Sequence, residues 1–179
     1  KDLLLKAAAI LVPIDAAALM EEPTSKGVGR WHDKINRPLQ LTDSLKMAFG
    51  TDDKIPRLVI LSPVKCEKYL QKEATAQALL QKVRLGYDPL LEFFKTERMR
   101  PRVAVVCAPV QTVGSVVFSR IEEQNSVPIF KYRKISADAA YDPKDNDQPL
   151  RYLFRFLLSV HIDARSWGFL DFLRDWLEL

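Results

Sequence analysis

Cys66 is the residue whose position comes nearest to that of a catalytic nucleophile. It follows the apolar run Leu58–Leu61 and opens a segment expected to be helical, and the positive end of a helix dipole favours a thiolate. A triad would combine a thiol, an imidazole and a carboxylate, from Cys66 or Cys107, His161 and Asp163. Because the segment after Cys66 lacks the glycines of a phosphate-cradling loop, we expect a buried core cysteine. A cysteine-dependent enzyme remains the second alternative.

Metal and nucleotide sites are not indicated by the spacing of the rare residues. The chain has two His and two Cys, without His-Glu-x-x-His, His-x-His or a cysteine pair. The acidic segment 138–148 lacks the glycine and closing glutamate of a calcium loop. Neither G-x-G-x-x-G nor G-x-x-x-x-G-K-[ST] is present, and G-x-S-x-G is also missing. We therefore assign no catalytic residue, metal ligand or cofactor, and we expect a protein that is not an enzyme.

Basic side chains concentrate in the middle of the chain, where residues 61–137 hold thirteen basic and seven acidic residues. Two clusters there are candidates for contact with phosphates: Arg98, Arg100 and Arg102, and Lys131, Arg133 and Lys134. Trp31, inside a third basic cluster at 26–37, and Tyr132 could stack on bases. RNA or DNA binding through a basic strand or hairpin face is therefore the first alternative. The other interpretation is a solvated surface with charged edge strands.

Apolar side chains are in excess at both ends of the chain, which favours contact with another protein. The segment Asp2–Glu22 is rich in Ala and Leu, and Trp167 and Trp176 stand near the other end. Trp is enriched at the centre of protein interfaces. We therefore expect a non-catalytic interaction or assembly domain of a larger complex, with Trp167 and Trp176 contacting another protein or a second copy. Alternatively, the two terminal helices pack on each other and close one core.

Periodicity of apolar residues predicts the elements that carry these residues. We expect helices over Asp2–Glu22, 42–49, 65–84, 88–98, 150–162 and 166–177, the first kinked or split at Pro13. Strands are expected over 57–61 and 102–108, with a hairpin of 113–121 and 127–135 turning at 122–126. The segment 150–162 also alternates like a strand, but its length and leucines favour a helix with one polar stripe on an otherwise buried cylinder.

The whole pattern predicts a single α+β domain over 1–179, with a small sheet of about four strands, including the hairpin, and about six helices. The chain of 179 residues is 47% hydrophobic and carries a net charge of +4, as expected for a folded domain. It opens at Lys1 rather than Met, so we expect a removed leader or a piece of a longer chain. The scarcity of cysteine favours a reducing, cytoplasmic location. With no run of 18 apolar residues, we expect no membrane span.

Overall fold

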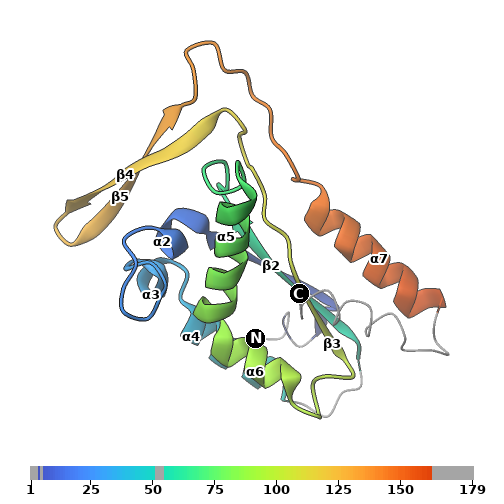
Figure 1. Ribbon diagram of the computed structural model, residues 1–179. Helices are drawn as coiled ribbons and strands as arrows, with labels where there is room; N and C mark the ends of the chain where they lie inside the picture. Colours follow the sequence, from blue (N-terminus) through green and yellow to red (C-terminus); the bar gives the residue numbers. More distant parts are fainter. Residues whose placement is uncertain (1–3, 5, 51–54, 163–179) are drawn as a thin grey trace.

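Three parallel strands form the central sheet: β1 (Ala9–Asp15), β2 (Arg57–Val64) and β3 (Val103–Cys107), in the order β1-β2-β3 (Figure 1). This computed structural model describes residues 4, 6–50 and 55–162. Nearly all of β2 and all of β3 are buried. Strands covered on both faces read as continuous apolar runs, and the two strands predicted in this region are confirmed.

The prediction of a helix over Asp2–Glu22 is wrong for Ala9–Asp15, which form the strand β1. Of the residues that follow β1 in this segment, only Ala16–Met20 (α2) are helical. A short apolar run has the same pattern in a buried strand and in a buried helix. Here the β-branched residues of Ala9–Asp15 favour the strand. Pro13 is tolerated because β1 lies at the edge of the sheet, where one side of the backbone needs no partner strand.

Helices cover both faces of the central sheet. On one face lie α2, α4 (Pro38–Phe49), α5 (Glu73–Gly86) and α6 (Asp88–Lys95), whose apolar side chains share the larger core with β1, β2 and β3. The short helix α3 (His32–Ile35) contacts α2 and α4. On the other face lies α7 (Gln148–Ile162) (Figure 1). The helices predicted over 88–98 and 150–162 are confirmed within a few residues, whereas α5 begins at Glu73 because residues 65–72 form a turn.

The hairpin forms a separate two-stranded sheet of β4 (Val116–Gln124) and β5 (Val127–Lys134). Its turn is tighter than expected, because Asn125 and Ser126 both have positive φ, at 50° and 61°. Two positive φ values in succession are typical of the turn whose twist matches a hairpin. The α+β class is confirmed, with five strands in two sheets and six helices among the described residues, so the single four-stranded sheet is replaced by a sheet and a hairpin.

Candidate functional site

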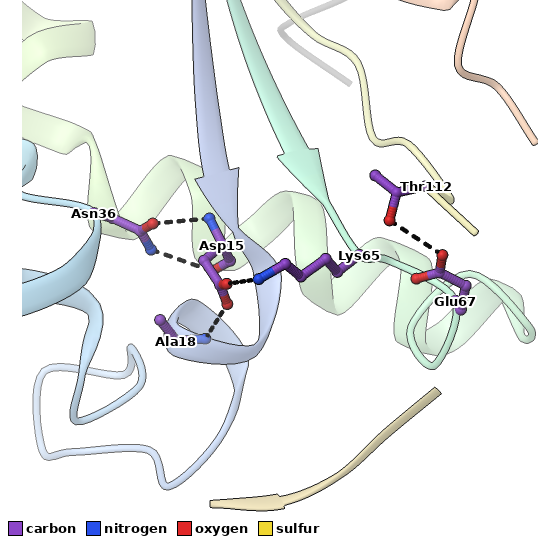
Figure 2. A network of polar contacts seen from close by, with 6 residues as sticks. All are labelled: Asp15, Ala18, Asn36, Lys65, Glu67 and Thr112. Atoms are coloured by element: carbon purple, nitrogen blue, oxygen red, sulfur yellow. Dashed lines mark hydrogen bonds and ion pairs between the residues drawn. The ribbon is translucent and has the colours of Figure 1, made fainter. Parts of the chain in front are cut away.

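The carboxyl ends of the parallel strands bring together polar side chains from distant parts of the chain (Figure 2). Asp15 ends β1, Lys65 and Glu67 follow β2, and Thr112 follows β3. Ligands of α/β proteins commonly bind at this edge of the sheet. This edge is therefore the candidate position for a ligand-binding or catalytic site.

Asp15 is at the centre of one half of this network (Figure 2). Its Oδ1 accepts a hydrogen bond from the Ala18 N–H at 3.0 Å, which caps α2, and its Oδ2 pairs with Lys65 Nζ at 2.8 Å. Asn36 holds the Asp15 backbone, because its Oδ1 accepts from the Asp15 N–H at 2.8 Å and its Nδ2 donates to the Asp15 carbonyl at 3.2 Å. Both carboxylate oxygens are thus engaged by groups of the chain itself.

Lys65 reaches Asp15 because the chain turns sharply after β2. Its φ is +60°, in the left-handed region that residues with a Cβ seldom adopt. Its Nζ also lies 5.5 Å from the centre of the Tyr132 ring on β5. Partial burial lowers the pKa of Lys65, but the hydrogen bond and charge of Asp15, together with Tyr132, outweigh it and raise the pKa above its ordinary value. Lys65 is therefore a permanent cation that links the two sheets.

Glu67 forms the other half of the network, and its carboxylate is buried. Its Oε1 accepts from the backbone N–H groups of Val113 at 2.7 Å and Gly114 at 3.2 Å, and the Thr112 hydroxyl lies 3.4 Å away. A buried carboxylate is stabilised by such donors. Glu67 therefore fastens the segment after β3 to the turn after β2, and the geometry of this edge supports a structural role for both carboxylates.

Cys66 lies between Lys65 and Glu67 in the sequence and is fully buried. Burial raises the pKa of its thiol to about 12, although the neighbouring backbone of Val110 acts in the opposite direction. Burial likewise raises the pKa of Cys107 to about 12. A nucleophilic cysteine needs the reverse shift. The buried, protonated thiols therefore do not support the triad of cysteine, His161 and Asp163. His161 belongs to the last turn of α7, and Asp163 lies outside the described residues.

We expect Cys66 and Cys107 in the folded protein to react with a thiol-specific disulfide reagent at neutral pH on the order of a thousandfold more slowly than free cysteine, since the thiolate is scarce and inaccessible. The urea-denatured protein, as the control, should show both thiols reacting rapidly. Fast labelling of one thiol in the folded protein would contradict the buried environment and restore the cysteine-enzyme alternative.

The two basic clusters do not share a sheet edge. Arg98, Arg100 and Arg102 lie in the turn between α6 and β3, at the bottom of Figure 1, and the other cluster lies on the hairpin at the upper left. Arg102 is buried, and one of its Nη atoms donates to the Phe49 carbonyl at 2.7 Å, while Arg98 donates to the carbonyl of Gly50. Arg100 is exposed, and it is the one residue of the three for which the described hydrogen bonds include no contact between its side chain and a backbone carbonyl.

Lys131, Arg133 and Lys134 are exposed on β5. Lys131 lies 3.4 Å from Glu122 across the hairpin, and Glu122 also pairs with Arg120. The hairpin tip is held to the rest of the molecule by Arg30, which pairs with Glu123 at 3.1 Å. Trp31 and Tyr132, the two aromatic residues considered for base stacking, are instead buried or partly buried under Arg30 and Lys65.

The outer side of α7 is the feature that the sequence did not predict. Phe156 faces the sheet and is 1% exposed, in contact with a buried cluster of β2 and β3 residues. The α7 stripe, on the opposite side, consists of four large apolar residues that are 36–58% exposed: Leu150, Phe154, Leu157 and Leu158. The expectation of a buried cylinder with one polar stripe is therefore wrong, because α7 covers the sheet with one side only.

A signal for the α7 stripe was present in its spacing. Positions 150, 154, 157 and 158 are four, three and one residues apart, which places them on one side of a helix with 3.6 residues per turn. Arg151 and Arg155 lie beside them, and Arg151 pairs with Asp147 at 2.6 Å. The sequence does not show how many sides of a mostly apolar helix are covered by the rest of the protein. The exposure of the α7 stripe is therefore seen only in the structure.

The other candidate partner residues, Trp167 and Trp176 of the expected helix 166–177, lie outside the described residues. Within the described ranges, no group of three or more His, Cys, Asp or Glu side chains is arranged to hold a metal ion. None of the described helices is both long enough and apolar enough to cross a membrane. Comparisons with protein-family models, with curated proteins and with solved structures found no match.

Proposed function

We propose that this chain is a protein-interaction or assembly domain whose docking surface is the α7 stripe. The observation that carries the proposal is the exposure of Leu150, Phe154 and Leu158, at 51%, 55% and 58%, on the side of α7 opposite the buried Phe156. Exposed apolar patches of this kind on a folded domain commonly mark contact sites for other proteins. The polar network at the carboxyl edge offers no comparable support for catalysis, since its carboxylates are engaged within the chain.

The chemistry of the α7 stripe favours an amphipathic helix as its partner. Apolar residues at positions i, i+4, i+7 and i+8 are the pattern by which helices dock along one another. Arg151 and Arg155 are the only Lys, Arg, Asp or Glu residues of α7, and both are exposed beside the stripe. A partner helix with acidic residues next to its apolar side would complement them.

The direct test is binding of a labelled, designed helical peptide, with leucines along one side and glutamates beside them, measured by fluorescence anisotropy on the full chain. We expect micromolar binding that changes by less than about threefold between 50 and 200 mM salt, because apolar contact dominates. Phe154→Asp should abolish binding, since it places a charge in the contact. Equal binding by the wild type and Phe154→Asp would overturn the proposal.

Two controls define the result. Lys131→Asp, on the hairpin, should leave peptide binding unchanged, and circular dichroism should show that Phe154→Asp remains folded. Labelled single-stranded RNA and duplex DNA provide the arm for the nucleic-acid alternative. Binding to them that weakens at least about tenfold over the same salt range, and that Lys131→Asp reduces, would favour the hairpin as the functional surface instead.

A further inference from the structure

We infer that the outer edge of β1 is a second interaction surface, at which β1 pairs antiparallel with β1 of a second copy of the chain. The inference goes beyond the proposed function, because the α7 stripe lies on another element and receives a helix rather than a strand. It rests on the backbone of β1, whose hydrogen-bonding groups point alternately toward β2 and away from it.

The printed hydrogen bonds identify the residues of β1 that point away from β2. The Leu58 N–H donates to the Ala8 carbonyl at 2.9 Å, so the even-numbered residues turn their backbone groups toward β2. Asp15 is odd-numbered, and both its N–H and its carbonyl bond to the Asn36 side chain instead, at 2.8 and 3.2 Å (Figure 2). The other outward backbone groups of the strand belong to Ala9, Leu11 and Pro13.

This edge is accessible. Apart from the ladder to β2, no hydrogen bond among the described residues engages the backbone groups of Ala9, Leu11 or Pro13. Pro13 is exposed, and the Leu11 side chain is 55% exposed. Besides α2, which follows it directly, β2 is the only described element in extensive contact with β1. By contrast, all of β3, at the opposite edge of the sheet, is buried.

The edge of β1 also lacks the charges that commonly keep edge strands apart. From Ala9 to Ile14 the strand has no charged residue, whereas β5 of the hairpin carries Lys131, Arg133 and Lys134. An accessible, uncharged edge strand is a template for pairing with another strand. A strand of another chain is therefore the occupant that the chemistry of this edge favours.

The donors and acceptors of the edge are complementary to themselves. When Leu11 lies opposite the partner's Leu11, each N–H donates to the carbonyl of the other. Ala9 then lies opposite the partner's Pro13, so the Ala9 N–H meets an acceptor at a residue that has no donor of its own. Opposite side chains in an antiparallel pair lie on the same face. The two exposed Leu11 side chains therefore cover each other, and every outward N–H of this stretch has an acceptor.

The row of open groups is bounded symmetrically about Leu11. At one end, the Ala7 carbonyl already accepts from Arg57 Nη1 at 3.2 Å. At the other end, the Asn36 side chain already occupies both backbone groups of Asp15. A second copy is bounded in the same way, so twofold pairing centred on Leu11 uses the open stretch of both chains and closes at the dimer.

The test is sedimentation velocity of the full chain at about 1 to 100 micromolar, where we expect a dimer with a micromolar dissociation constant. Leu11→Lys and Leu11→Glu should each raise this constant at least about tenfold, because like charges meet at the centre of the pair. An equimolar mixture of the two variants should restore dimerisation, since opposite charges then meet. Leu39→Lys is the matched control, because Leu39 on α4 is similarly exposed, at 62%, and it should leave the dimer unchanged.

Other outcomes overturn the inference. A monomer throughout this range would do so, and so would a dimer that Leu11→Lys leaves unchanged. Loss of the dimer that the mixture does not restore would exclude pairing centred on Leu11. Loss of the dimer in Phe154→Asp instead would assign self-association to the α7 stripe. Peptide binding to the stripe should be equal in Leu11→Lys and the wild type, so failure of this inference is distinguishable from failure of the proposed function.

A disulfide at the centre of the pair gives an independent measurement. Opposite Cα atoms in a hydrogen-bonded antiparallel pair are about 5.5 Å apart, which a disulfide can span. Leu11→Cys should therefore form a covalent dimer under mild oxidation with diamide at least about tenfold faster than Leu39→Cys. The native Cys66 and Cys107 are buried, so they do not compete. Equal rates for the two variants would contradict the pairing of β1 with its copy.

Discussion

Glu67→Ala is expected to lower the free energy of unfolding by about 3 kcal/mol, because it leaves two backbone donors at a partly buried site without an acceptor. These donors are the N–H groups of Val113 and Gly114, which bond the carboxylate at 2.7 and 3.2 Å. The alanine side chain cannot replace either bond, and Glu67 itself is 3% exposed, so water has little access. Urea unfolding followed by circular dichroism measures the loss.

Two milder substitutions separate the hydrogen bonds from the volume of the side chain. Glu67→Gln keeps an acceptor oxygen and the same size, and we expect it to cost about 1 kcal/mol. Thr112→Val removes only the longer 3.4 Å contact, and we expect a change below about 0.5 kcal/mol. A Glu67→Gln loss as large as that of Glu67→Ala would show that charge, rather than the accepted bonds, stabilises the turn.

The sequence was sufficient for the parts of the fold that local patterns specify. β2 and β3 are apolar runs bounded by turn residues, and α6 begins at Asp88-Pro89, where proline fits the first turn of a helix. The hairpin was found from its two β-branched and aromatic segments. In each case the signal lies within a few neighbouring residues.

Other features depend on which face of an element is covered, and local patterns do not contain that information. The sequence of β1 favours a helix because residues 9–12 are all apolar, so the residue types do not alternate even though Leu11 is exposed and Val12 and Ile14 are buried in the structure. Asp15 and Lys65 are 50 residues apart, and their 2.8 Å ion pair follows only from the parallel pairing of β1 with β2. The exposure of the α7 stripe likewise follows from the single layer of sheet against which α7 packs.

The attachment of α7 to the sheet leads to the second large expected effect. Phe156 is 1% exposed and packs among Leu58, Ile60, Ala104 and Val106 of β2 and β3. Phe156→Ala should lower the free energy of unfolding by about 4 kcal/mol, since burial of a phenylalanine is lost and a cavity is left beneath the helix. Urea unfolding again measures the loss.

Arg155→Ala is the matched control, because Arg155 precedes Phe156 in α7 and is exposed. It should change the free energy of unfolding by less than about 0.5 kcal/mol, since alanine is also a good helix former. If Phe156→Ala cost less than about 1 kcal/mol, α7 would not be part of the cooperative core, and hydrogen exchange should then find its amides unprotected. The α7 stripe would in that case belong to a detachable helix. A full loss of about 4 kcal/mol would instead make α7 a rigid platform, as a docking surface for another helix requires.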